Sequence, residues 1–130
     1  MYFLCVHEDA AFDLERLWSV EPDAAARILV LLEELEGNQD LLSSLTEHGF
    51  GEYTDEDYSV SKWLAFWNRG RDLWRLKIWD LEDKGLYYRI IYAYVPETQH
   101  YHVLAIAPRN FNYDTSHPIS RRIYKAYEDL

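Results

Sequence analysis

Four basic residues in the second half of the chain have a spacing that suits the binding of a phosphate group. Arg75 and Lys77 lie two residues apart in an apolar segment, Arg89 interrupts the run LYYRIIYAYV, and Arg109 follows the run YHVLAIAP. Arginine presents a planar fork of donors to phosphate oxygens, and lysine presents a point charge. Because all four residues belong to apolar, strand-like segments, we expect them to converge on one face or rim of a sheet and to bind a phosphodiester.

Aromatic residues and a histidine follow the last of these cations. Phe111 and Tyr113 come just after Arg109 and can offer stacking surfaces for unpaired bases. Cleavage of RNA through the neighbouring 2′-hydroxyl needs a base, an acid and cations, but no metal ion. His117 titrates in a range that suits acid–base work. It also precedes Pro118 at a predicted helix start, so capping of that helix is the competing interpretation.

A purely structural role for the arginines is the main alternative. An arginine in the middle of an apolar strand is costly to bury without a partner. Arg75 and Arg89 therefore either face a ligand or form ion pairs with Asp72, Asp80 or Glu82, and the sequence leaves both interpretations open. The acidic stretch 52–57 lacks the ligand spacing and turn glycine of a calcium loop. We expect no metal site and no cofactor.

The apolar pattern predicts the elements that position these residues. Residues 1–7 read as a strand, 8–19 and 22–37 as a helical hairpin, and 116–130 as a helix, while 59–67, 72–79, 86–95 and 100–107 read as strands separated by turns. The predicted fold class is α+β, with the helices packed on one face of a sheet. It has an N-terminal strand and an α-hairpin packed on an antiparallel β-meander, with a C-terminal helix, in a single domain over 1–130. Strand alternation places Arg75 and Lys77 opposite the core residues Trp74, Leu76 and Ile78.

Charge is divided unevenly along this chain of 130 residues with a net charge of −10. Residues 1–59 hold fifteen acidic and two basic residues, whereas residues 60–130 hold eight acidic and eleven basic ones. This asymmetry permits a basic face on an acidic body, although solvated acidic helix faces explain it equally well. The single cysteine, Cys5, excludes an intramolecular disulfide. The opening MYFLCVHEDA resembles neither a signal peptide nor a membrane span, so we expect a cytoplasmic protein without a membrane partner.

The segments LWRLKIWD, GLYYRIIYAYV and YHVLAIAPRNFNYD resemble the core of the RelE/ParE toxin superfamily. That core has a basic strand of the form xRLKx, a strand with the pattern YRxxY, and an apolar strand that ends in Arg with a Tyr shortly after. The corresponding residues here are Arg75-Leu76-Lys77, Tyr88-Arg89-Ile90-Ile91-Tyr92, and Arg109 with Tyr113. The predicted helical hairpin before them also fits the family's order of elements.

The resemblance implies the toxin of a type II toxin–antitoxin system. RelE-like members are metal-independent endoribonucleases that cleave messenger RNA, often in the ribosomal A site, and a cognate antitoxin protein neutralises them. The residues expected from the resemblance to be catalytic are Lys77, Arg89, Arg109 and Tyr113, and those expected to bind RNA are Arg75, Lys77 and Phe111. Arg109 would hold the scissile phosphate, and Tyr113 would transfer a proton or stack on a base.

Two alternatives remain beside the nuclease. ParE-like members inhibit DNA gyrase and are not nucleases, and an inactive phage-associated relative would keep the fold alone. The chain also departs from the family pattern, because Pro108 stands where many relatives carry His or Lys before the last arginine, and because the family is usually basic.

Overall fold

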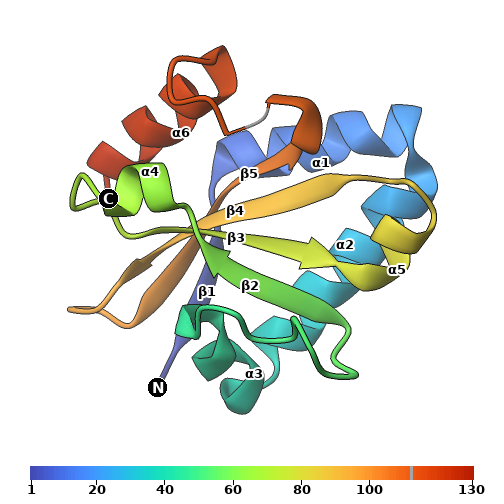
Figure 1. Cartoon of the computed structure of the whole chain (residues 1–130), viewed down its shortest axis with the longest axis horizontal. Coiled ribbons are helices and arrows are strands. Elements are labelled where there is room, and N and C mark those ends of the chain that lie inside the picture. Colours follow the sequence, from blue (N-terminus) through green and yellow to red (C-terminus); the bar gives the residue numbers. More distant parts are fainter. Residues whose placement is uncertain (112) are drawn as a thin grey trace.

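The computed structural model describes residues 1–111 and 113–130, and its centre is one five-stranded sheet (Figure 1). The strands are β1 (Phe3–Val6), β2 (Tyr58–Lys62), β3 (Leu73–Ile78), β4 (Tyr88–Val95) and β5 (His100–Pro108). Their order is β1-β5-β4-β3-β2. Strands β2 to β5 form antiparallel pairs, as the sequence predicts, whereas β1 adds to the edge of β5 in the parallel direction. The α+β class is confirmed, with a mixed sheet.

The three longer helices begin at residues that favour a helix start. The helices are α1 (Glu8–Val20), α2 (Pro22–Glu36), α3 (Gln39–Ser43), α4 (Leu64–Trp67), α5 (Trp79–Asp83) and α6 (Pro118–Glu128), with 3-10 turns η1 (Ser44–Thr46) and η2 (Arg109–Phe111). His7 Nδ1 accepts the Asp9 N–H at the start of α1, and Pro22 occupies the first turn of α2. No helix of the described residues is long and apolar enough to cross a membrane.

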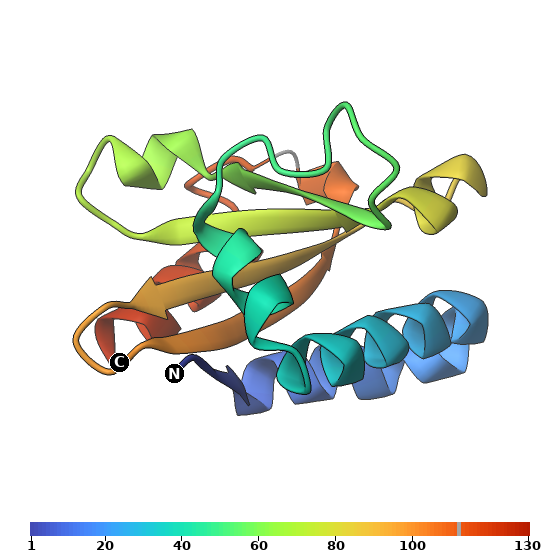
Figure 2. The ribbon, with the colours of Figure 1, turned by 90° about the horizontal axis from the view of Figure 1, so that it is seen from below.

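The hairpin α1–α2 covers one face of the sheet (Figures 1 and 2). Its apolar side chains and those of this sheet face form the first core, which includes Ile28, Leu31, Leu76, Tyr92 and Val103. The alternating residues Trp74, Leu76 and Ile78 all belong to it, as the sequence predicts. The hairpin is therefore fixed by ordinary burial of apolar area, at about 25 cal/mol for each Å² removed from water.

The opposite face is also partly covered, which corrects the expectation that the helices pack on one face only. The second core lies there and includes Trp63, Phe66, Ile91, Phe111 and Ile123. α6 packs on β5 through this core, and α4 supplies Phe66. The cause is that β4 and β5 are apolar on both sides, so each face needs a cover.

The expected strand 59–67 is correspondingly shorter than predicted. β2 ends at Lys62, and the chain forms the single helical turn α4, which brings Trp63 and Phe66 into the second core. α4 and α6 leave one end of this second sheet face uncovered by helices. The uncovered end holds the polar side chains of β2, β3 and β4, and these form the candidate site.

Candidate functional site

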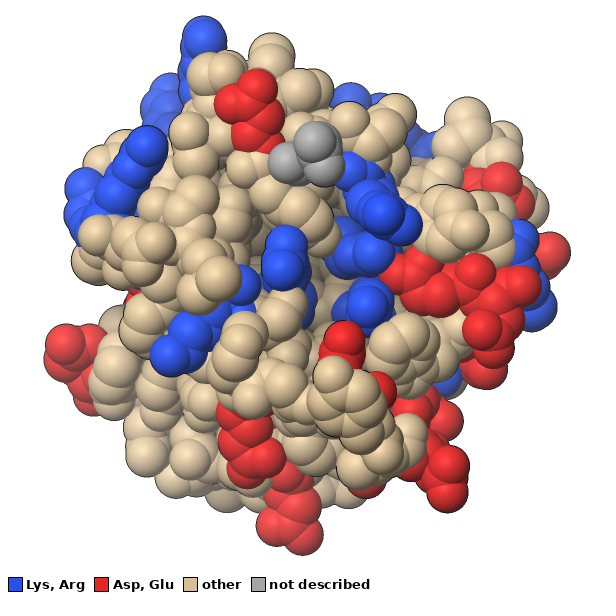
Figure 3. Space-filling view, in the orientation of Figure 1, with Lys and Arg blue, Asp and Glu red and all other residues tan. Residues whose placement is uncertain are grey.

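A pocket of about 740 Å³ lies on the second face of the sheet, beyond the second core. The side chains Arg75, Lys77, Arg89, Arg109 and Tyr113 all line it. In Figure 3, Lys and Arg side chains gather near the centre of the face that shows β2 and β3, with acidic side chains around them. The convergence expected from the strand pattern is therefore present in the structure, and it includes every residue predicted as catalytic.

Strands β2 and β3 position the first two cations. Ser61 pairs with Arg75 and Ser59 with Lys77 across the two strands. Arg75 Nε donates to Ser61 Oγ at 2.7 Å, and its guanidinium carbon lies 4.4 Å from the centre of the Tyr113 ring. Lys77 Nζ lies 4.6 Å from the centre of the Trp79 ring. These hydroxyl and π partners orient the cations without cancelling their charge.

Arg89 has a different environment, because it is the buried cation of the pocket. It is 7% exposed, and its Nη1 donates to the Tyr88 carbonyl at 3.0 Å and contacts Glu82 Oε1 at 2.5 Å. The ion-pair interpretation is thus confirmed for Arg89 with Glu82, whereas Arg75 pairs with a serine. A carboxylate partner is what allows an arginine to be buried in a strand.

Arg109 stands at the end of β5, as the first residue of η2, and is exposed. Its guanidinium carbon lies 5.5 Å from the centre of the Tyr87 ring. It also lines a neighbouring hollow together with Tyr87 and Pro108. Arg109 therefore forms the rim between two hollows and can reach a ligand that extends from one to the other.

Tyr113 is the acid–base candidate of the pocket. Its ring packs against Trp63 and Phe111, and its buried hydroxyl has no hydrogen-bond partner among the described residues. Burial raises the pKa of Tyr113 above its ordinary value, and the charges of Arg89 and Arg75 offset part of that rise. The phenol therefore keeps its proton at neutral pH and can act as a proton donor.

The backbone of Tyr113 has a φ of 54°, in the left-handed region. This conformation costs a non-glycine residue about 1–2 kcal/mol. The packing of its ring against the second core holds the residue there.

Phe111 is not placed to bind RNA. It is 2% exposed and belongs to the second core, where its ring contacts Trp63 and Tyr113 edge-on. Apolar packing has drawn this side chain inward, so its role in the structure is to support Tyr113. His117 caps α6 by accepting the Ile119 N–H through Nδ1, which confirms the capping interpretation.

The loop between η1 and β2 forms a wall of the pocket that the sequence did not predict. It contributes His48, Gly49, Glu52 and Tyr53, and Tyr53 is 98% exposed. Two backbone hydrogen bonds dock it on β2: Gly49 N–H to the Val60 carbonyl and Val60 N–H to the Phe50 carbonyl. The Trp79 indole N–H donates to the Gly51 carbonyl at 3.0 Å and ties the same loop to α5.

The pocket carries net positive charge in an acidic protein. Four cations and the two carboxylates Glu52 and Glu82 line it, which leaves a balance of +2. Ser59, Ser61 and Glu82 were not predicted as site residues. The alternation Tyr58-Ser59-Val60-Ser61 could have indicated the serines, whereas Glu82 looked like part of a turn.

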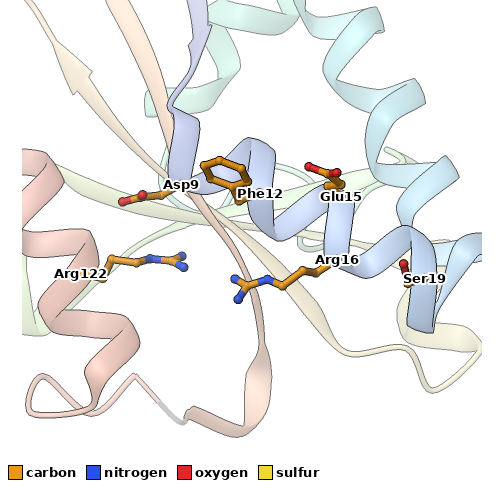
Figure 4. Close-up of a pocket in the computed structure, with 6 residues that line it drawn as sticks. All are labelled: Asp9, Phe12, Glu15, Arg16, Ser19 and Arg122. Carbon is orange, nitrogen blue, oxygen red and sulfur yellow. The ribbon is translucent and has the colours of Figure 1, made fainter.

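A second hollow, of about 580 Å³, lies beside α1 and is lined by Asp9, Phe12, Glu15, Arg16, Ser19 and Arg122 (Figure 4). Its two arginines are already paired. Both oxygens of the buried Asp13 accept from Arg122, at 2.9 and 2.6 Å, and Arg16 contacts the same carboxylate at 2.6 Å. This cluster fastens α6 to α1 and leaves little free charge for a ligand.

No family model, curated protein or solved structure matches this chain. Within the described residues, no three or more His, Cys, Asp or Glu side chains are grouped so as to hold a metal ion.

Proposed function

We propose that this protein is a RelE-like toxin of a type II toxin–antitoxin system and that its pocket binds and cleaves messenger RNA without a metal ion. One observation carries the proposal. Arg75, Lys77 and Arg109 line the pocket, and their partners, a hydroxyl and aromatic rings, do not neutralise their charge. The protonated phenol of Tyr113 lies beside them. A polyanionic substrate whose leaving oxygen needs a proton fits this combination.

Each side chain has a definite part in the proposed reaction. The guanidinium groups of Arg75 and Arg109 and the ammonium of Lys77 bind the phosphate and stabilise the charge that grows on its oxygens. The 2′-oxygen attacks the adjacent phosphorus, the bond to the 5′-oxygen breaks, and the Tyr113 hydroxyl supplies the proton that this oxygen needs. The products are a 2′,3′-cyclic phosphate and a 5′-hydroxyl end.

The proposed partners follow from the same chemistry and from the family resemblance. Messenger RNA, free or on the ribosome, is the substrate, and a cognate antitoxin protein is the inhibitor. A gyrase inhibitor of the ParE type has no need of cations around a single phosphate, which is why the nuclease is the preferred function.

The test uses the purified protein, a labelled RNA and EDTA, with and without ribosomes. We expect cleavage that survives EDTA and leaves cyclic phosphate ends. Arg109→Ala should lower the rate by about 10²–10³-fold, since it removes one donor to the transition state. Arg121→Ala, an exposed arginine of α6 outside the pocket, is the matched control and should cleave normally.

Three results would contradict the proposal. The first is full activity of Arg109→Ala, and the second is activity that EDTA abolishes and a metal ion restores. The third is intact RNA accompanied by gyrase-linked DNA damage in cells, which would support the ParE-like alternative instead.

A further inference from the structure

Glu82 is the most shielded acid in the pocket, and the proposed reaction above gives it no role. It lies on α5, next to Leu81 of the first core, and its side chain is 14% exposed. Oε1 contacts Arg89 Nη1, while the buried Oε2 has no hydrogen-bond partner among the described residues. A buried carboxylate oxygen without a donor costs free energy. The side chain is therefore held by one contact only, the contact with Arg89.

That contact engages one of the donor nitrogens that Arg89 could offer to a phosphate. Nη1 makes the contacts with both the Tyr88 carbonyl and Glu82, and the Tyr113 hydroxyl is a further neighbour of the guanidinium. Carboxylates and phosphates compete for the same planar fork of donors. A phosphate bound in the pocket therefore weakens the hold of Arg89 on Glu82.

The proposed reaction needs a group that accepts the proton of the 2′-hydroxyl. Tyr113 is unsuited, since it keeps its own proton. His48 is exposed, and its Nδ1 already accepts the Lys62 N–H at 3.0 Å. Glu52 is exposed on the loop and makes no described contact with a cation of the pocket. Glu82 is a carboxylate in contact with one of the phosphate-binding cations.

We infer that Glu82 is the general base of this site and that it exchanges Arg89 for the substrate. When the phosphate binds to Arg89, the Glu82 carboxylate accepts the 2′-hydroxyl proton while the 2′-oxygen forms its bond to phosphorus. The bond from phosphorus to the 5′-oxygen breaks, and that oxygen takes the Tyr113 proton. Glu82 has then gained one proton and Tyr113 has lost one, and exchange with water restores both. The inference rests on the proposed nuclease function.

This role has two consequences of opposite sign. Glu82 competes with the phosphate for Arg89, so removing its charge should strengthen RNA binding. Glu82 also takes the proton, so the same change should slow cleavage. A residue that only supports the fold would weaken both.

The experiment compares Glu82→Gln with the wild-type protein on RNA cleavage and on binding of the same sequence in uncleavable 2′-O-methyl form. We expect kcat to fall by roughly 10²–10⁴-fold. We expect the 2′-O-methyl RNA to bind more tightly, by up to roughly fivefold. Asp83→Asn, an exposed neighbour on α5 outside the pocket, removes the same charge and should change neither quantity.

Glu82→Asp gives a second measure, in case Glu82→Gln does not fold. It keeps a carboxylate but withdraws it by one methylene, so cleavage should be slowed less than in Glu82→Gln. Unchanged kcat in a folded Glu82→Gln, or weakened binding of the 2′-O-methyl RNA, would overturn the inference and leave the nuclease proposal standing. A wild-type protein that neither cleaves RNA nor binds its 2′-O-methyl form would overturn both.

Discussion

At the scale of single residues, the nature of each cation's partner decides how much charge reaches a ligand. Arg75 rests on a serine hydroxyl and a tyrosine ring, and Lys77 rests on an indole ring. Arg89 instead faces a carboxylate that largely cancels its charge. The first two are therefore ready to bind an anion, whereas Glu82 competes with an anion for Arg89. A count of basic residues in the sequence treats every cation as equally able to bind an anion, whereas the structure shows that their partners differ.

Tyr113 gives a prediction with a definite pH dependence. Because burial raises its pKa above the ordinary value of a tyrosine, the phenol stays protonated through neutral and mildly alkaline pH. If it donates a proton, Tyr113→Phe should lower kcat by roughly 10²–10⁴-fold with little change in RNA binding. Rate–pH profiles of wild-type and variant proteins measure this effect.

The sign of the Tyr113 dependence can be checked directly. The wild-type rate should not decline between pH 7 and pH 9 through loss of the Tyr113 proton. A Tyr113→Phe protein that cleaves at the wild-type rate would show that the ring, and not the hydroxyl, is what the site uses. In that case the residue serves to stack on Arg75 or on a base.

At the scale of elements, the sequence predicts those parts whose pattern repeats. The α-hairpin and β3 carry clear apolar periods, β4 and β5 are continuous apolar runs, and all of them lie where they were expected. The parallel pairing of β1 with β5 depends on contacts between distant segments, for which the local pattern has no signal. Because β4 is apolar on both sides, the sequence indicates that the second face of the sheet must also be covered. It does not say which helix covers that face.

The candidate site divides in the same way. Three of its four cations lie on regular strands, so alternation placed Arg75 and Lys77 correctly. Glu82 and the wall 48–53 come from a short helix and a loop, where no period exists. Phe111 was misassigned because a sequence does not tell whether an aromatic residue after a strand turns inward or outward, and here the second core takes it.

Gly51 allows a prediction about the loop as an element. Its φ is 76°, and a Cβ built on it would lie 1.8 Å from the Tyr58 carbonyl oxygen. Gly51→Ala should therefore displace the loop from β2 and from Trp79, in addition to the strain of a positive φ. We expect a loss of unfolding free energy of about 1–3 kcal/mol from the strained backbone conformation, and more from the clash.

Gly70→Ala is the matched control, because Gly70 has a φ of 77° and nothing within 4 Å of its built Cβ. The difference between the two variants in urea denaturation isolates the clash with Tyr58. Equal losses of stability would mean that the loop yields easily, and the wall of the pocket would then be less firmly fixed than its hydrogen bonds indicate.

At the scale of the whole molecule, a basic pocket must act within an acidic body. The net charge of −10 repels a polyanion at long range, whereas the pocket itself has a balance of +2. At physiological ionic strength charges are screened over about 8 Å, so the pocket attracts a phosphate only after close approach. An acidic peptide segment of a flexible partner protein is likewise repelled at long range and attracted by the pocket only after close approach.

The final prediction is that an antitoxin encoded beside this gene neutralises the protein by covering the pocket. Arg75, Lys77 and Arg109 repel one another when no ligand is bound, and they attract an acidic segment that folds on binding. Tyr53, almost fully exposed at the edge of the pocket, offers apolar contact to the same segment, whereas Trp79 and Tyr113 are half-buried and offer less. Co-expression with the neighbouring open reading frame should therefore restore growth and yield a complex that co-purifies.

The charge pattern makes this complex testable by substitution. Arg75→Glu with Lys77→Glu should weaken it, most clearly at low salt, where surface charges are least screened. Arg121→Glu with Lys125→Glu applies the same charge change to exposed positions of α6 outside the pocket and should leave binding intact. An antitoxin that binds both double variants equally well would have to dock elsewhere. The acidic α1–α2 hairpin, to which a basic stretch of the antitoxin could bind, is the next surface to test. If neither flanking gene product binds, the toxin–antitoxin assignment loses its main support, and an inactive relative becomes the better description of the chain.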